Sequence, residues 1–160
     1  MSKIAIYPGT FDPLTNGHLD LIQRTLTIFD KVIIGVAASS KKRPLFTTEE
    51  RIRLIQDSIK DFKGASVESF DTLLVHYAKD KGSAAIIRGL RAISDYEYEL
   101  QMALTNRRLD STVETVFMMP SEEHTFISSS IVKEVASFGG SVKGFVPKAV
   151  EKALKEKYKK

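Results

Sequence analysis

Short apolar runs alternate with amphipathic helical stretches along the sequence, and this alternation constrains the fold more than any other feature. Strands alternating with helices favour a parallel sheet with helices on both faces. Because crossover connections in such sheets are right-handed, the pattern predicts an α/β, Rossmann-like doubly wound fold with a five-stranded parallel sheet, in a single domain over residues 1–160. The predicted strands are residues 4–7, 31–38, 66–70, 84–87 and 113–119.

The stretches between these runs carry helical signals. Apolar residues recur at steps of three and four in 19–29, which is the pattern of one helix face. Thr47 with Glu50, and Ser94 with Glu97, have the spacing of a capping box at a helix start. We therefore expect helices that begin near 17, 47, 73, 94, 128 and 147.

Composition and hydropathy indicate a protein of the cytoplasm. The chain has no Cys, so it holds no disulfide, which is compatible with a reducing compartment. No apolar run approaches the roughly 20 residues that span a bilayer. The first residues, MSKIAIYPGT, lack the apolar core and cleavage site of a signal peptide. We expect a cytoplasmic protein without a membrane partner.

The loop after the first predicted strand has the marks of a phosphate site. In doubly wound sheets, ligands bind beyond the carboxyl ends of the strands. Residues 9–18 follow the first strand but contain neither G-x-G-x-x-G nor a P-loop motif. Thr10 offers a hydroxyl and a backbone N–H, and His18 falls in the first helical turn, where free N–H groups favour anions. We interpret His18 as a ligand-binding residue rather than an ordinary half-buried histidine.

Two later loops carry further groups suited to phosphate. Arg88 and Arg91 flank a glycine directly after the fourth strand, and arginine forks match phosphate oxygens in two-point contacts. Surface salt bridges are the alternative for this pair. Residues 128–130 are three consecutive serines at a helix start. One of them caps the helix, and their hydroxyls with the free N–H groups form a phosphate cradle.

These motifs resemble those of the nucleotidyltransferase superfamily. Thr15–His18 reads T-x-G-H, and residues 127–133 read ISSSIVK, the second motif of that superfamily. More narrowly, the chain resembles the bacterial phosphopantetheine adenylyltransferases, with which it shares nearly its whole length. The segments that carry this resemblance are YPGTFDPLTNGH at 7–18, SSKKRPLFT at 39–47, IIRGLRAISDYEYE at 86–99 and MPSEEHTFISSSIVKEV at 119–135.

The resemblance implies a reaction in coenzyme A biosynthesis. ATP and 4′-phosphopantetheine would give dephospho-coenzyme A and pyrophosphate, in the penultimate step of that synthesis. The nucleophile is a phosphate oxygen of the substrate, so the protein must position two anions and stabilise charge on the α-phosphate. Mg²⁺ is implied as cofactor, bound mainly through the ATP phosphates, with no protein metal cage. Asp12 is one nearby carboxylate, which could equally cap its turn.

The resemblance also implies roles for individual residues. As catalytic residues, His18 would bind the α-phosphate, Thr10 would orient the attacking phosphate, and Lys42 would neutralise it, with Arg91 on ATP. Lys42 lies in a Lys41-Lys42-Arg43 run that alone would indicate a solvated loop. Contacts to phosphopantetheine fall on Thr10, Lys42, Leu74 and Arg88. Contacts to ATP fall on Thr10, Phe11, His18, Gly89, Leu90, Arg91, Glu99, His124, Thr125, Phe126, Ile127, Ser128, Ser129 and Ser130.

Partners follow from the same resemblance, and two rival functions stay open. A homohexamer and feedback inhibition by coenzyme A are implied. One rival is another T-x-G-H transferase acting on a mononucleotide or on a sugar- or glycerol-phosphate, against which the RGLR and DYEYE segments argue. The other is a nucleic-acid-binding module, suggested by the net charge of +4 and the pI of about 9.2. Five Lys and two Glu in 151–160 place +3 of that charge in one tail, so we expect no nucleic-acid partner.

Overall fold

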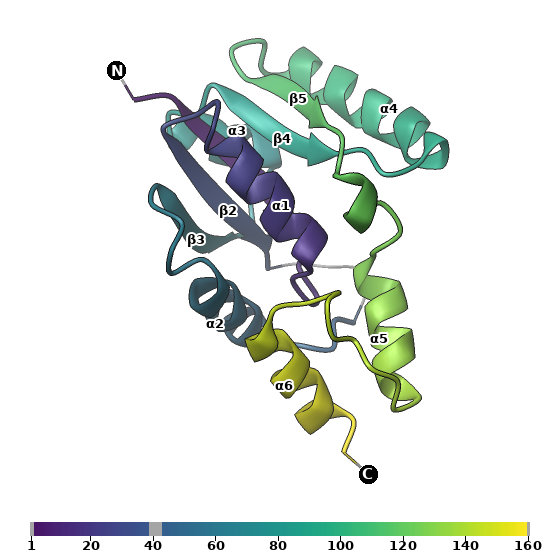
Figure 1. The fold of residues 1–160 in the computed structure, drawn as a ribbon. Helices are drawn as coiled ribbons and strands as arrows, with labels where there is room; N and C mark the ends of the chain where they lie inside the picture. Colours follow the sequence, from purple (N-terminus) through teal and green to yellow (C-terminus); the bar gives the residue numbers. More distant parts are fainter. Residues whose placement is uncertain (1, 39–42, 160) are drawn as a thin grey trace.

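The computed structural model describes residues 2–38 and 43–159, whose strands form one parallel sheet (Figure 1). The strand order is β3-β2-β1-β4-β5, with every neighbouring pair parallel. All five predicted strands and the doubly wound α/β fold are therefore confirmed. The strands are β1 (Ile4–Gly9), β2 (Lys31–Ala37), β3 (Ala65–Phe70), β4 (Ala85–Gly89) and β5 (Glu114–Met118).

The central strands β1 and β4 separate toward their carboxyl ends. β1 pairs with β2 along its whole length, but it pairs with β4 only at Ala5 and Ile6. The winding also reverses here, because β2 and β3 extend on one side of β1, while β4 and β5 extend on the other. Ligands of doubly wound sheets bind at this reversal. The carboxyl ends of β1 and β4 are therefore where a site is expected.

Apolar cores lie on both faces of the sheet because successive strand residues point to opposite sides. Ala5 and Tyr7 of β1 belong to the larger core, with residues from the helices after β1 and β2. Ile6, between them, belongs to the smaller core on the opposite face, with Ile86 and Val75. A sheet buried on both faces explains why its strands read as continuous apolar runs in the sequence.

The helices follow the strands in alternation until the carboxyl end of the chain (Figure 1). Those after β1 and β2 contribute Ile22 and Ile55 to the larger core, and the last two contribute Val132 and Leu154 to it. No helix of the described residues is long and apolar enough to cross a membrane. The helices are α1 (Asn16–Thr25), α2 (Thr48–Ser58), α3 (Leu74–Asp80), α4 (Ile93–Leu109), α5 (Ser129–Ser137) and α6 (Lys148–Lys157).

One predicted helix start is confirmed, and another is wrong. Thr47 caps α2 by accepting from the Glu50 N–H, while the Glu50 carboxylate accepts from the Thr47 N–H. The expected Ser94 start is wrong, because α4 begins one residue earlier, at Ile93. Ala92 is the extended residue before that helix, and no side chain caps it. Capping spacing alone therefore misplaced this start, because α4 begins without a side-chain cap.

Candidate active site

A polar cavity of about 360 Å³ opens where β1 and β4 separate. Its walls come from the loops after these strands, from the first turns of α1 and α5, and from the segment before α5. The fold thus brings together residues from both halves of the sequence. The predicted site residues that line the cavity are Thr10, Phe11, His18, Arg88, Gly89, Arg91, Glu99, His124, Ile127, Ser128, Ser129 and Ser130.

The T-x-G-H motif is a capping box that uses a histidine. Thr15 is the N-cap of α1, and its hydroxyl accepts from the His18 N–H at 3.3 Å. In return, Nδ1 of His18 accepts from the Thr15 N–H at 2.9 Å. A nitrogen that accepts this bond carries no proton, so the proton of the neutral ring lies on Nε2. The cap therefore fixes both the ring orientation and the tautomer of His18.

The surroundings of His18 keep its ring uncharged. Burial, together with the positive charge of Arg91, lowers the pKa of His18 from 6.5 to about 4. The ring also meets the edge of the Phe11 ring at a centroid distance of 5.0 Å. At neutral pH His18 is consequently a neutral hydrogen-bond donor through Nε2, located at a helix N-terminus beside the cavity.

The loop after β1 is held in a conformation that its sequence disfavours. Phe11 has φ of 51°, a left-handed conformation that is uncommon for a bulky residue and costs of the order of 1–3 kcal/mol. The buried carboxylate of Asp12 anchors the next position, because it accepts from the N–H groups of Leu45 and Phe46, both at 2.9 Å. Lys133 completes the anchor with Nζ 2.8 Å from Asp12 Oδ2. Asp12 is thus a structural acceptor in this loop.

Arg88 and Glu99 form a paired unit on the opposite wall. Nε and Nη2 of Arg88 donate to the two carboxylate oxygens of Glu99 at 2.8 and 2.5 Å. Burial opposes the charge of Arg88, but the hydrogen bonds and charge of Glu99 outweigh it and raise the pKa of Arg88. Nη1 has only a 3.4 Å contact with the carbonyl of Pro8, at the end of β1. The remaining donor capacity of Arg88 therefore lies between the two separated strands.

The N-termini of α1 and α5 both line the cavity without acidic residues in their first turns. Among the other helices, α2, α4 and α6 have acidic residues there, which offset the positive end of the helix dipole, whereas α3 has none. Ser128 caps α5 by accepting from the Ile131 N–H, as predicted for one of the three serines. Arg91 lies nearby, with Nη1 3.4 Å from the Ile127 carbonyl. Arg91 also lies 3.8 Å from Asp95, so each arginine is paired with a lining carboxylate, as the salt-bridge alternative supposed. The two helix N-termini and the donors that the arginines keep free of these pairs favour anionic ligands in this cavity.

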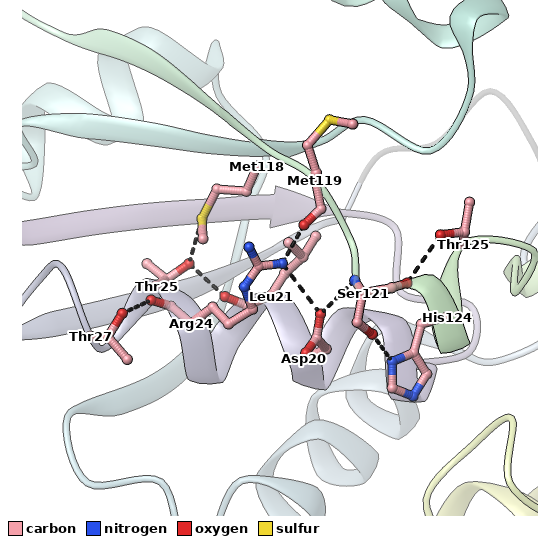
Figure 2. Close-up of polar contacts among 10 residues, drawn as sticks. All are labelled: Asp20, Leu21, Arg24, Thr25, Thr27, Met118, Met119, Ser121, His124 and Thr125. Atoms are coloured by element: carbon pink, nitrogen blue, oxygen red, sulfur yellow. Dashed lines mark hydrogen bonds and ion pairs between the residues drawn. The ribbon is translucent and has the colours of Figure 1, made fainter.

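The segment that carries His124 is tied to α1 by polar contacts (Figure 2). Asp20 accepts from the Ser121 N–H at 3.2 Å, and Arg24 donates to the Met119 carbonyl. The Ser121 hydroxyl lies 2.6 Å from Nδ1 of His124. His124 is the last residue of a short 3-10 helix (Glu122–His124). These contacts place one wall of the cavity relative to the helix that carries His18.

Some predicted site residues do not line the cavity. Leu74 begins α3 and is half-buried against the smaller core. Leu90 is half-buried and donates its N–H to the Met118 carbonyl. The Thr125 hydroxyl donates to the Ser121 carbonyl, and Phe126 is exposed with its ring against Phe145. Lys42 lies outside the described residues.

Lys133 is a cavity-lining cation to which the sequence analysis gave no role. It belongs to the ISSSIVK motif and lies on the cavity with Arg43. Helical spacing could have indicated this residue. Lys133 follows Ser129 and Ser130 by four and three positions, so it shares their helix face. In the described part of the chain, no cluster of three or more His, Cys, Asp or Glu side chains could hold a metal ion.

Comparison with known proteins finds close relatives over the full chain. The cytidylyltransferase-like family matches residues 6–135. The chain is 62% identical to the phosphopantetheine adenylyltransferase of Thermodesulfovibrio yellowstonii, covering 100% of both chains. It is 54% identical to the enzyme of that name from Alkalilimnicola ehrlichii, covering 99% of this chain and 92% of the relative. The one from Moorella thermoacetica is 51% identical, with 98% of each chain covered.

A solved structure shares the fold at low identity. It is a bifunctional NMN adenylyltransferase/ADP ribose pyrophosphatase from Francisella tularensis, complexed with AMP and a Mn ion. The TM-score is 0.69 at 16% sequence identity, and the match covers 98% of this chain but 49% of that one. At this identity the likeness supports the Rossmann-like fold alone.

Proposed function

The chain belongs to the cytidylyltransferase-like family, and from that premise we propose that it is an enzyme that transfers the adenylyl group of ATP to 4′-phosphopantetheine. The products are dephospho-coenzyme A and pyrophosphate. The observation that carries this function is the cavity itself, in which two helix N-termini, Arg88, Arg91 and a neutral His18 converge. The reaction brings two anions together, and these groups suit that task.

The reaction needs no nucleophile from the protein. An oxygen of the phosphopantetheine phosphate attacks the α-phosphorus of ATP and forms a new P–O bond. The bond between the α-phosphorus and the oxygen that bridges the α- and β-phosphates breaks, and pyrophosphate leaves with the electron pair of that bond. Catalysis then consists of holding the two phosphates in line and stabilising the charge on the α-phosphate oxygens.

His18 is the group that stabilises the transferring phosphate. Its Nε2–H is a neutral donor of fixed direction, because the capping bond from Thr15 holds Nδ1. A donor whose pKa is lowered to about 4 keeps its proton arrangement across neutral pH. It acts as a hydrogen-bond donor to the α-phosphate and does not shuttle a proton.

The remaining groups divide between the two substrates. Thr10 and Lys42 orient and neutralise the attacking phosphate, with Arg88 on the same substrate and Leu74 on its pantetheine arm. Arg91 and the first turn of α5 bind the phosphates of ATP, and those other predicted ATP contacts that line the cavity surround the nucleotide. Both oxygens of Glu99 accept from Arg88, so the first role of Glu99 is to orient that arginine. Its contact with ATP is a second role.

Divalent metal use is in keeping with the nucleotidyltransferase family, and we propose Mg²⁺ as the ion. The oxygens of Asp12 accept from two N–H groups and from Lys133, so this carboxylate is not free to be a metal ligand. The ion is held mainly by ATP phosphates and water, which suits magnesium. When bound, it offsets the negative charge of those phosphates.

Helix α4 exposes several large apolar side chains. Tyr98, Leu104 and Leu109 of α4 are 62%, 55% and 51% exposed, which is unusual for large apolar side chains gathered on one helix. This supports association of copies, and we propose the homohexamer, with coenzyme A as feedback inhibitor and the cytoplasm, where ATP is available, as location. Sedimentation analysis at micromolar concentration, with and without coenzyme A, tests the assembly.

A pyrophosphate-release assay tests the reaction. The protein is incubated with ATP, MgCl₂ and either 4′-phosphopantetheine or nicotinate mononucleotide as acceptor. We expect release with phosphopantetheine to exceed release with the mononucleotide by orders of magnitude. Equal release with both, or release with the mononucleotide alone, would contradict the proposed acceptor.

A further inference from the structure

Arg51 is a buried cation that the proposed mechanism does not use. It lies in the first turns of α2 and is 1% exposed, the largest fully buried side chain among the described residues. Within the same residues, no carboxylate lies within salt-bridge distance of its guanidinium. Burying a charge without a direct ion pair is costly: burial lowers the pKa of Arg51, and the charges of Asp12 and Glu49 offset this only in part. An apolar side chain could hold this helix against the sheet without that cost. Packing alone therefore does not explain why an arginine occupies this position.

The guanidinium binds the backbone around the acceptor side of the cavity. Nη1 donates to the carbonyl of Thr10 at 2.8 Å and to that of Ala37 at 3.1 Å. Nε donates to the carbonyl of Phe46 at 3.2 Å. Nη2 donates to the Thr48 hydroxyl at 3.0 Å, which fixes the plane of the group. One side chain thus joins the loop after β1, the end of β2 and the approach to α2.

Arg51 and Asp12 hold opposite sides of a strained residue. Phe11 has the left-handed φ of 51°, and such a conformation persists only where its surroundings fix it. Arg51 binds the carbonyl of the residue before it, and the Asp12 carboxylate binds the chain after it to Leu45 and Phe46. Both anchors end on residue Phe46, so the two loops are fixed relative to each other.

The bond to Thr10 also acts on the cavity directly. The Thr10 carbonyl and the Phe11 N–H belong to the same peptide group. A charged donor on the carbonyl oxygen polarises that peptide and strengthens its N–H as a donor. Thr10 and Phe11 both line the cavity, so the effect of Arg51 reaches a ligand although its own guanidinium is buried behind the loop.

From these contacts we propose that Arg51 is a positioning residue for adenylyl transfer, which sets the place of Thr10 and Phe11 through their backbone. The inference rests on the proposed function, in which Thr10 handles the attacking phosphate. It predicts a loss that falls mainly on turnover and on the acceptor. ATP should lose much less affinity, because Thr10 and Phe11 are only two of its expected contacts and the others lie in the loops after β4 and β5 and in the first turn of α5.

The test compares Arg51→Met and Arg51→Lys with Arg53→Lys and Arg53→Met as controls. Arg53 belongs to the same helix and is exposed, away from the cavity. Steady-state kinetics with each substrate varied in turn, calorimetric binding of a non-hydrolysable ATP analogue, and thermal melts are measured on each protein. Arg51→Met should lower kcat by tenfold or more per folded molecule, with analogue affinity within threefold of wild type. Arg51→Lys should recover part of kcat, because an ammonium donates to some of these carbonyls but cannot span them all.

Two results would overturn the proposal. One is wild-type kcat and KM in folded Arg51→Met, and the other is a fall in ATP-analogue affinity as large as the fall in kcat, which indicates general loss of structure. If Arg51→Met does not fold, Arg51→Lys is the test. Wild-type kinetics in Arg51→Lys would contradict the positioning role. If the wild-type protein uses nicotinate mononucleotide instead of phosphopantetheine, the proposed function is refuted. The effects of Arg51→Met on kcat and on ATP-analogue affinity are then compared with that acceptor.

Discussion

The two walls of the cavity are tied to the scaffold in different ways. The loop after β1 is held by buried charged groups, with the Arg51 residue 1% exposed and the Asp12 side chain 5% exposed. The segment before α5 is held to α1 by Asp20 and Arg24, whose side chains are 20% and 44% exposed (Figure 2). Buried charged hydrogen bonds are costly to break, whereas exposed ion pairs contribute little. We infer a fixed wall and an adjustable wall.

The difference suits the proposed chemistry. The attacking phosphate must lie in line with the bond that breaks, so the wall that carries Thr10 gains from rigidity. ATP is larger and meets many groups, so the wall that carries His124 tolerates small shifts. His18 lies between the walls, with its ring against Phe11 and its helix tied to Ser121. Substitutions on the two walls test this contrast, and the largest effect is expected at His18, which lies between them.

His18→Ala should give the largest effect. The variant removes the only proposed donor that strengthens in the transition state, so kcat should fall by about 10²-fold or more with little change in KM. His76→Ala, in the exposed part of α3, is the matched control and should keep wild-type kinetics. Turnover close to wild type in folded His18→Ala would contradict the role.

Asp12→Asn tests the fixed wall. The change leaves Lys133 without its charged partner and sets an amide group against two N–H donors, so the free energy of unfolding should fall by about 2–3 kcal/mol. Chemical denaturation measures it. The exposed Asp61→Asn should change stability by less than about 0.5 kcal/mol. An equal small effect of both substitutions would remove the contrast between the walls.

Arg88→Ala and Arg91→Ala should separate the two substrates. Arg88→Ala should raise the KM for phosphopantetheine, and Arg91→Ala the KM for ATP, each by about ten- to a hundredfold, since a charge-assisted contact contributes roughly 1.5–3 kcal/mol. Lysine at either position should rescue only in part. A melt must accompany Arg88→Ala because it leaves Glu99 unpaired. The exposed Arg53→Ala, on α2, is the control. Equal effects on both substrates would refute the division.

Asp20→Ala should give the smallest effect, because it tests the adjustable wall. The change removes the bond from the Ser121 N–H and the 3.7 Å ion pair with Arg24. The Asp20 side chain is half-buried, but its hydrogen bond and its ion pair are both long, so together they should contribute roughly 0–1 kcal/mol, and kcat/KM for ATP should change by less than about fivefold. Asp57→Ala, which breaks the surface pair with Lys60, should leave kinetics unchanged. A hundredfold loss in Asp20→Ala would show that this wall is as fixed as the other.

Much of the fold could be predicted because it depends on local patterns. The five apolar runs indicated the strands, and their alternation with helices predicted the sheet. The separation of β1 and β4 could not be predicted, since strand pairing depends on how distant segments pack. The start of α4 at Ile93 was missed because the residue before the helix, Ala92, has no capping side chain and so leaves no signal in the sequence.

Sequence motifs indicated many of the residues that line the cavity, but not how these residues pair with one another. Thr10, His18, Arg88 and Ser128 all line one cavity, but nothing in the sequence showed that Arg88 is held by Glu99. The capping role of His18 follows from its place three residues after Thr15, yet capping boxes are ordinarily sought with Glu or Gln at that position. Arg51 carries no local signal at all, because its partners are carbonyls of distant loops.

The central claim is that a neutral His18 with its proton on Nε2 lies where the two phosphates meet. ¹⁵N NMR of the histidine rings, with His18 assigned by its absence in His18→Ala, measures this directly in a pH titration. The bond that Nδ1 accepts from Thr15 predicts an Nε2–H tautomer, and the lowered pKa predicts that it stays unchanged from about pH 5.5 to pH 8, with the ring protonating only near pH 4. A midpoint near 6.5, or a proton on Nδ1, would contradict the account.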